Sequence, residues 1–234
     1  MVTAFAFAWL LWVGPAICEP IAYDTPEWRK EIAHGCLPYH RLVRDDFPID
    51  DKAHSRYAMY TTGFFHYHYK YVCSGEEHHV VVRITEWKVR SGFDRNKSSR
   101  KSWFKFVERL LPHEQGHLDL NELHSRRVAQ MELGELPAGE GETSAQALKD
   151  LQTKLKALSN RTSKDGQAEQ DAYDTETAHG TNKPRQLAAT AAIQKRLKKA
   201  GITYAAESNG DQIDAASEPK TPLDEAGRAL NKNR

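Results

Sequence analysis

The stretch LLPHEQGHLDLNELHSRR, residues 110–127, contains the pattern His-Glu-x-x-His at His113, Glu114 and His117. Residues four apart on a helix lie one above the other, about 5–6 Å between their Cβ atoms, so both imidazoles can bind one metal ion. In zinc enzymes with this pattern, zinc lowers the pKa of a bound water toward about 7 and the glutamate takes its proton. The spacing therefore predicts zinc (Zn2+) at His113 and His117, with Glu114 as the catalytic base.

A third protein ligand has to come from another part of the chain. Asp119 and Glu122 are rotated well off the face that carries His117, at about 100° per residue. His124 returns to that face, but it lies about 10.5 Å further along the axis, beyond the reach of metal bonds of about 2.0–2.1 Å. We expect Asp119, Glu122 and His124 to be solvated polar groups or, for the two acids, supports that orient a ligand histidine.

The best candidate for the third ligand is His179, in the cluster YDTETAHG at residues 173–180. Donors and carboxylates are concentrated in this cluster, and the glycine beside the histidine lets the backbone approach another element closely. From these residues alone Asp174 and Glu176 stay open as substitutes for His179.

A β-hairpin is predicted upstream of the His-Glu-x-x-His helix. Aromatic residues recur at every second position in YAMYTTGFFHYHYKYV, residues 57–72, and HHVVVRITEWKV, residues 78–89, also alternates, so both segments are typical of strands. Residues 73–76 predict the turn, and the polar stretch 91–102 a loop. His66 and His68 share one face of the first strand and are expected to be exposed.

Helical spacing follows the hairpin. Residues 103–111 have apolar side chains at helical intervals, Pro112 is expected to kink or restart the helix, and the helix should continue to about Leu133, with Gly134 as its cap. Residues 144–158 and 184–199 predict two further helices. Between them, residues 160–170 are weakly patterned and residues 173–180 are expected to form a loop.

The chain ends indicate an exported protein with a polar tail. An uncharged apolar run from Val2 to Val13 is shorter than the ~20 residues needed to span a bilayer, and Gly14, Pro15 and small residues follow it. We therefore expect a signal peptide at residues 1–18, one domain at residues 19–204, and a disordered tail at residues 205–234. Secretion or a periplasmic location follows.

The charge composition of the chain argues against nucleic acid or a membrane surface as its binding partner. The 234 residues include 33 basic and 32 acidic side chains, a net charge of +1, so no overall field attracts nucleic acid or a membrane surface. We expect a protein or peptide substrate, a class that includes the peptides of peptidoglycan. We expect no binding of nucleic acid, and no stable membrane insertion after the signal peptide is removed. With Cys18 removed, Cys36 and Cys73 would form a disulfide in an oxidising compartment.

The run VERLLPHEQGHLDLNELHSRR, residues 107–127, resembles the central motif of a family of bacterial exported proteins of unknown function, described as predicted secreted zinc-dependent proteases. The family pattern there is LL-x-HEQxHFDI-x-E-x-x-AR, and Leu118 and Leu120 stand where Phe and Ile are usual. LVRDDFPID, residues 42–50, is similar to the family's L-x-W-x-DF-x-G, with Arg44 in place of the aromatic residue. YDTETAHGTNKPRQ, residues 173–186, is similar to its YD-x-x-T-x-HG-x-x-x-x-x-Q. The resemblance covers roughly residues 41–199.

The residues and this resemblance together predict a secreted or periplasmic zinc metallopeptidase with an α+β, zincin-like fold. A small antiparallel sheet would pack beside the His-Glu-x-x-His helix, and later helices would supply the remaining ligand. Zinc would be held by His113, His117 and His179, with Glu114 as general base and Tyr173 as a donor to the oxyanion. Two alternatives stay open: a zinc amidase acting on peptidoglycan, and a catalytically inert zinc-stabilised envelope binding module. An intact Glu114 argues against the second.

Overall fold

The structure is a computed structural model that describes residues 26–52, 57–76 and 78–204. It has a mixed α+β fold of antiparallel strands and three main helices. The helices are α1 (Pro26–Ala33), α2 (Val107–Ala129), α3 (Ser144–Thr177) and α4 (Lys183–Lys199), with a 3-10 turn at Arg44–Asp46. The strands are β1 (Cys36–Pro38), β2 (Met59–Tyr60), β3 (Gly63–Glu76), β4 (His79–Asp94), β5 (Ser99–Arg100) and β6 (Gly139–Gly141).

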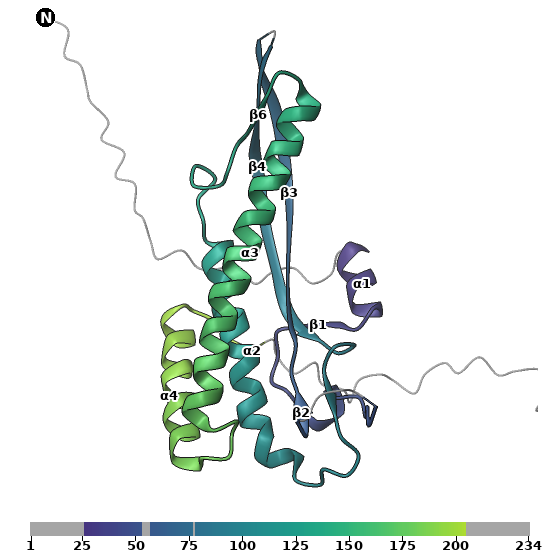
Figure 1. Ribbon diagram of the computed structural model, residues 1–234, viewed down its shortest axis with the longest axis vertical. Helices are drawn as coiled ribbons and strands as arrows, with labels where there is room; N and C mark the ends of the chain where they lie inside the picture. Colours follow the sequence, from purple (N-terminus) through teal and green to yellow (C-terminus); the bar gives the residue numbers. More distant parts are fainter. Residues whose placement is uncertain (1–25, 53–56, 77, 205–234) are drawn as a thin grey trace, which may run out of the picture.

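Strands β3 and β4 form a long antiparallel hairpin that projects beyond α2 and α4 (Figure 1). Its register pairs Gly63 with Phe93 and Glu76 with His79, with one irregularity between Lys70 and Tyr71. The other edge of β4 pairs with β1 near its end and with β6 near its start, which completes a four-stranded sheet. Strands β2 and β5 form a separate two-stranded sheet.

Helices α2, α3 and α4 pack side by side at the base of the hairpin (Figure 1). Helix α3 is antiparallel to α2, because its contacts join Asp174 to His113 and, further back, Glu169 to His124. The first half of α3 lies instead along the hairpin and β6. One long helix therefore connects the hairpin to the region around His113.

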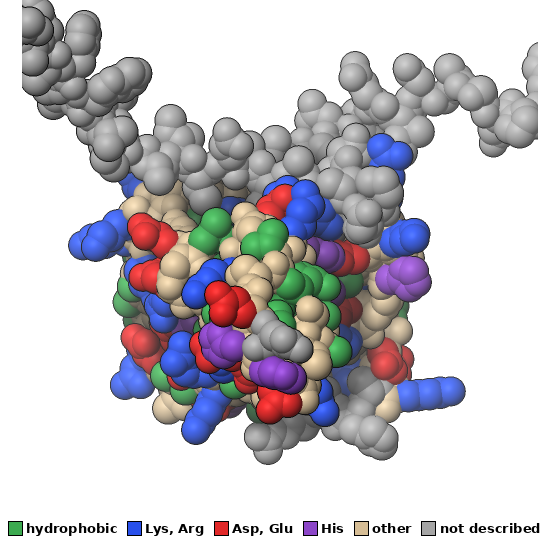
Figure 2. Space-filling view, turned by 90° about the horizontal axis from the view of Figure 1, so that it is seen from above, with side chains coloured by type: hydrophobic (Ala, Val, Ile, Leu, Met, Phe, Trp, Pro, Cys, Tyr) green, Lys and Arg blue, Asp and Glu red, His purple; other side chains and the backbone are tan. Residues whose placement is uncertain are grey.

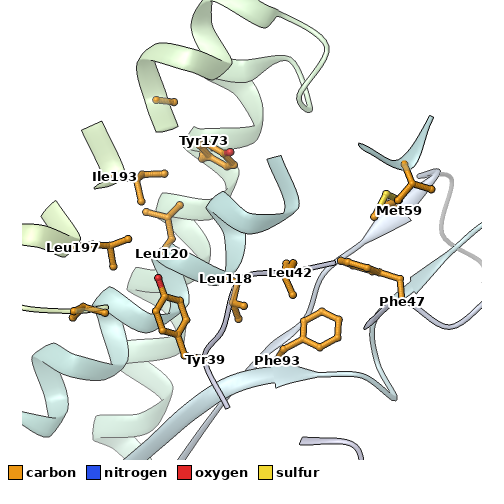
Figure 3. Packing of buried hydrophobic residues seen from close by; sticks show 13 residues of the cluster. Tyr39, Leu42, Phe47, Met59, Phe93, Leu118, Leu120, Tyr173, Ile193 and Leu197 are labelled. Carbon is orange, nitrogen blue, oxygen red and sulfur yellow. The ribbon is translucent and has the colours of Figure 1, made fainter. Parts of the chain in front are cut away.

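The larger hydrophobic cluster fixes how α2 is rotated about its axis. Leu118 points toward Phe93 and Leu42, whereas Leu120 points toward Ile193 of α4 (Figure 3). Both leucines are almost completely buried, and full burial of such a side chain stabilises the fold by about 1.5–3 kcal/mol. With these two faces of α2 committed to packing, a third face is left for its histidines.

A second, smaller cluster holds the first half of α3 on the hairpin. Leu151 and Leu155 of α3 are buried against Val82 and Ile84 of β4. Leucines four apart lie on one helical face, and valine and isoleucine two apart lie on one face of a strand. This contact sets the direction in which α3 continues toward α2.

Helix α3 is much longer than the sequence pattern predicts. The expected helix ended at residue 158 and residues 173–180 were expected to be a loop, but the helix continues without a break to Thr177. Residues 159–177 contain no proline, and the face that they turn to α2 is polar rather than apolar. Hydrophobic periodicity therefore does not reveal this half of the helix.

Other boundaries also differ from the prediction. Helix α2 starts at Val107, passes through Pro112 as one helix, and ends at Ala129 rather than Leu133. Residues 73–76, expected as a turn, belong to β3, and β4 extends through residues 91–94, expected as loop. The buried Ser91 explains the second error, because its hydroxyl hydrogen-bonds a buried carboxylate of α2 and so satisfies a polar side chain inside the structure.

The predicted disulfide between Cys36 and Cys73 is wrong, because both are free thiols. Cys36 pairs with Asp94 at the end of β4, whereas Cys73 pairs with Val82 near its start. At about 3.3 Å per residue these positions are roughly 40 Å apart, and a disulfide needs Cα atoms within about 7 Å.

The predicted signal peptide and the predicted polar tail, residues 205–234, lie outside the described residues. Among the helices of residues 26–52, 57–76 and 78–204, none combines the length and apolar character that crossing a membrane requires. Seen from the hairpin end, acidic and basic side chains are interspersed over the surface (Figure 2), in keeping with the net charge of +1.

Candidate metal centre

Helix α2 brings His113 and His117 together as their spacing predicts. Their Nε2 atoms are 3.2 Å apart, and the two rings meet edge to face with centroids at 4.6 Å. His113 and His117 are one helical turn apart, on the face of α2 that does not carry Leu118 and Leu120. His113 is buried and His117 is nearly so, so the two imidazoles form a preorganised pair.

Asp174, near the end of α3, completes a group of three possible metal-binding side chains. Its Oδ1 lies 3.1 Å from Nε2 of His113 and 3.0 Å from Nε2 of His117. Around a tetrahedral zinc with bonds of about 2.05 Å, neighbouring ligand atoms are ~3.3 Å apart. The three atoms therefore form a triangle of nearly the size that one zinc ion requires.

The hydrogen bonds around this triangle leave its three atoms facing one another without a shared proton. Oδ1 of Asp174 is buried and has no hydrogen-bond partner. Nδ1 of His113 donates to Oε1 of Gln186 at 3.1 Å, and Nδ1 of His117 donates to Oε1 of Gln170. In neutral imidazoles both Nε2 atoms then carry lone pairs. A cation fits this donor set, because it balances the charge of three facing acceptors.

Gln170 and Gln186 hold the two histidines, a role that the sequence alone did not identify. Gln170 also donates from Nε2 to the backbone carbonyl of His117 at 2.9 Å, so it holds both the ring and the chain. Histidine ligands commonly donate their second nitrogen to an oxygen, which fixes the tautomer and ring orientation. In the sequence, Gln186 stood out only as a matching position of the family pattern. No signal in the sequence pointed to Gln170.

Other residues of the same family pattern surround His113. The ring of Tyr173 stacks on that of His113, with centroids 5.0 Å apart and planes at 12°. Thr177 Oγ1 lies 3.4 Å from Nδ1 of His113. Gly180 has φ +75°, and a Cβ atom there would stand 2.8 Å from Cβ of His113. The pattern Tyr-Asp-x-x-Thr-x-His-Gly-x-x-x-x-x-Gln therefore supplies one possible metal-binding residue, Asp174, and surrounds another, His113.

The predicted catalytic Tyr173 is buried behind His113 and is not among the described residues that line the cleft beside the metal centre. Its hydroxyl donates to the backbone carbonyl of His113 at 3.2 Å and accepts from Nε2 of Gln186 at 2.7 Å. Burial raises the pKa of its phenol, and the nearby carboxylates raise it further, against the lowering effect of the Gln186 hydrogen bond. The phenol is therefore neutral, and its hydroxyl both donates and accepts hydrogen bonds.

Charges within the triangle shift two pKa values in opposite directions. Burial lowers the pKa of His117, but the contact with Asp174 and the charge of Glu114 outweigh burial, so the net shift is upward. Burial raises the pKa of Asp174, but its contacts with His113 and His117 outweigh this and the net shift is well below the usual range. The centre therefore keeps Asp174 ionised and attracts positive charge.

Glu114 is buried in the wall of the cleft, directly beside the two histidines in sequence. Its Oε2 accepts a hydrogen bond of 2.6 Å from Oγ1 of Thr61, which lies between β2 and β3. This bond fixes the orientation of the carboxylate beside the two histidines. Thr61 gave no sign of this role in the sequence, where it is one of the alternating residues of a strand pattern.

His179 lies at the edge of the centre but outside the converging group. Its Nδ1 is 3.4 Å from Oδ2 of Asp174, its side chain is 50% exposed, and its ring lies 5.3 Å from that of Tyr57. The backbone is in the left-handed region, with φ 52°. His179 as a third ligand stays a prediction, and Glu176, the other alternative, is exposed.

Asp119, Glu122 and His124 are buried, which corrects the expectation that they are solvated. Asp119 accepts hydrogen bonds from Tyr39 and Gln115, both at 2.8 Å, and from Gln194 at 2.9 Å. Glu122 binds Ser91 and Arg126, and His124 binds Glu169 at 2.7 Å. None of these recorded bonds reaches a ligand histidine, so the three residues join α2 to its neighbours instead.

The sheet histidines are as exposed as predicted. His66 and His68 are each nearly half exposed, with ring nitrogens 3.5 and 3.7 Å from Oε1 of Glu31 in α1. His54 lies outside the described residues.

A cleft of about 810 Å³ opens over the centre. His113, Glu114, His117 and Asp174 all line it, and its volume is within the usual range of ligand-binding pockets. The possible metal-binding group and the buried Glu114 thus line the same cleft.

A comparison with protein families gives one match, described as a bacterial protein of unknown function, DUF922, over residues 42–180. The comparisons with curated proteins and with solved structures gave no match. The matched range includes α2, Asp174 and Gly180, which is the greater part of the metal centre, and it spans more than half of the chain. The chain therefore belongs to this family of bacterial proteins.

Proposed function

We propose that this protein is a zinc-dependent peptidase that hydrolyses amide bonds, with a zincin-like active-site helix. One observation carries the proposal: an unpartnered buried oxygen of Asp174 faces two imidazole nitrogens beside a buried glutamate. Two imidazoles and one carboxylate are a donor set typical of catalytic zinc, which keeps a fourth position open.

Zinc would be held by His113, His117 and Asp174. When bound, zinc polarises a carbonyl and makes water a better nucleophile near neutral pH. Glu114, fixed by Thr61, accepts the proton of the attacking water at Oε1 and passes it to the leaving amine. Gln170 and Gln186 hold the two imidazoles in the tautomer that presents Nε2.

Tyr173 and His179 each already have a partner within the protein, which decides how each meets the substrate. Tyr173 can donate to the oxyanion only if its bond to the His113 carbonyl breaks. His179, half exposed at the cleft beside Asp174, is in a better position to contact the substrate carbonyl. We propose that Asp174 is the third ligand and that His179 acts on the substrate.

Separate features of the chain support the proposed location and the choice between an enzyme and a binding module. The apolar run at residues 2–13 supports export and therefore a substrate outside the cytoplasm. A purely structural zinc site needs no base, so the buried Glu114 at the cleft favours an enzyme over an inert binding module. An amidase acting on peptidoglycan would use the same residues and is separated from a peptidase by its substrate.

The test is Glu114→Gln in the full chain, with Glu108→Gln as the matched control. The amide keeps the shape but cannot take a proton, so hydrolysis should fall by about 10²–10⁴-fold while zinc stays near one ion per chain. Glu108 is exposed on the same helix, and its variant should match wild type in both measurements. Metal content and cleavage of a panel of casein and peptidoglycan give the readout.

Unchanged hydrolysis in Glu114→Gln would remove Glu114 from the mechanism. Loss of zinc from this variant would make Glu114 a ligand instead of a base. Activity on peptidoglycan alone would select the amidase.

A further inference from the structure

The cleft follows the axis of α2, so the order of its residues along the helix is also their order along the cleft. Leu110, His113, His117, Asn121 and Ser125 all line it. At 1.5 Å per residue, Leu110 and Ser125 are about 22 Å apart along the axis. An extended peptide advances about 3.3 Å per residue, so this length accommodates about six or seven residues, with the metal centre in between.

One end of the cleft, at the start of α2, is formed largely by aromatic side chains. We define Tyr60, Trp103 and Phe106 as the aromatic wall; all three line the cleft, and they are 47%, 65% and 56% exposed. The guanidinium of Arg109 lies 4.4 Å from the ring centroid of Phe106. Trp103 and Phe106 both pack edge to face on Phe104, which joins them to the core. Large aromatic side chains that line a cleft and remain about half exposed are available to bind a ligand.

The other end of the cleft, toward the end of α2, is lined by neutral polar side chains. Asn121 and Ser125 come from α2, and Thr162, Ser163 and Gln167 come from the antiparallel α3. This end offers hydrogen-bond donors and acceptors, with Phe65 as an apolar group beside Asn121. The two ends therefore select opposite kinds of substrate side chain.

We propose that the substrate is an extended peptide whose large apolar or aromatic side chain binds the aromatic wall while its polar residues lie at the other end. This inference rests on the proposed peptidase function and adds the specificity of the same site. A large apolar side chain that leaves water for such a wall gains about 10- to 100-fold in kcat/KM over a small polar one.

A peptide side chain fits the wall better than a sugar does. Sugars that stack on aromatic rings also need hydrogen-bonding groups at the rim of the ring. Near the wall the cleft is lined by apolar groups such as Met59 and Leu110, with the cations Arg109 and Lys183 as its charged groups. Apolar lining of this kind selects side chains by the area that they bury.

The experiment uses zinc-loaded full chain and a set of quenched peptides of seven residues, in which one Phe is moved through a Ser/Gly/Ala background. Wild type should cleave the best Phe peptide at least 10-fold faster than its Ser counterpart. In the double variant Trp103→Ala/Phe106→Ala this ratio should approach one. Tyr71→Ala, an exposed aromatic on the hairpin outside the cleft, should keep the wild-type ratio.

Binding to the inactive Glu114→Gln variant, followed by fluorescence anisotropy of labelled peptides, separates this inference from the proposed function. Selective binding of Phe peptides without cleavage by wild type would overturn the peptidase and leave the wall as a peptide site. Cleavage without preference for Phe, or a preference that survives the double variant, would overturn the wall's role. Binding of chitin-type oligosaccharides in place of peptides would overturn it as well.

Discussion

Gln186 and His113 are hydrogen-bonded in the interior, with Nδ1 of the imidazole 3.1 Å from Oε1 of the amide. The same amide donates from Nε2 to Tyr173 Oη at 2.7 Å, and the tyrosine donates to the backbone of His113. The ring and the backbone of one residue are thus held by a single closed set of bonds. Nε2 of His113 is left to point at Asp174.

Gln186→Leu should lower zinc affinity by about 10- to 100-fold, because the ring loses the acceptor that sets its tautomer and orientation. Leu187→Ala changes the adjacent residue, which is 72% exposed, and should have no effect. Competition with a chromophoric chelator measures both affinities. Gln186→Glu retains an acceptor and should recover binding; if the leucine variant binds zinc as tightly as wild type, Gln186 does not position His113.

Gly180→Ala should destabilise the protein and weaken zinc binding together. Gly180 has φ +75°, and an added Cβ would stand 2.8 Å from Cβ of His113, so a strained backbone and a clash combine to cost about 1–3 kcal/mol. Gly201→Ala is the matched control, since φ is +67° but nothing lies within 4 Å of its added Cβ. Thermal unfolding and zinc titration of both variants should show loss of metal affinity only for Gly180→Ala.

The interaction of His40 with Asp46 should make stability depend on pH. Burial lowers the pKa of His40, but the 3.0 Å hydrogen bond to Asp46 outweighs it, so the pKa is raised in the folded protein. The stabilisation is therefore full below about pH 6.5 and is lost as pH rises through the folded pKa. Wild type should therefore have a larger free energy of unfolding than His40→Gln at low pH. This difference should shrink by about 1 kcal/mol as the pH rises through the folded pKa of His40.

Denaturant unfolding at several pH values gives this difference. In an Asp46→Asn background the same His40→Gln substitution should show little dependence on pH. A difference that grows with pH would mean that the pair does not raise the pKa of His40.

The sequence predicted the part of the site that depends on spacing within one helix. His113, Glu114 and His117 are local, so 3.6 residues per turn suffices to place them. Asp174 was available only as an alternative to His179, because residues 173–180 were expected to be a loop. Asp174 lies on α3, whereas His179 lies in the turn that follows the end of this helix at Thr177.

Long-range packing explains what could not be predicted. Gln170 and Thr61 reach the centre from segments brought close only by the fold. The separation of Cys36 and Cys73 depends on the register of β4 with both β1 and β3, which no local pattern fixes. The mixed α+β class and the hairpin were predictable because alternation and helical spacing are local signals.

Cys36 and Cys73 should be free in the purified protein, including protein recovered from an oxidising compartment. Their strand register separates them by most of the length of β4, so a bridge would require the hairpin to unfold. Alkylation without reductant, followed by mass spectrometry, should label both thiols. A cross-linked peptide containing both cysteines would contradict the register of the hairpin.

The sequence predicts His179 as the third zinc ligand, whereas the geometry of the fold favours Asp174. Removing one of three ligands weakens zinc binding far more than removing a neighbour does. Asp174→Ala should therefore lose zinc on dialysis, as His113→Ala should, whereas His179→Ala and Glu176→Ala should retain it. His124→Ala controls for loss of a buried histidine on the same helix that binds Glu169 instead of the centre.

Loss of zinc from His179→Ala together with its retention in Asp174→Ala would reverse the assignment. His179 would then be the ligand, as its place in the family pattern suggests, and its 3.4 Å contact with Asp174 would become the hydrogen bond that orients it. Retention of zinc by His113→Ala would contradict the zinc site itself, because both assignments of the third ligand include His113. Measuring metal content in all of these variants, each checked for folding by circular dichroism, distinguishes the three cases.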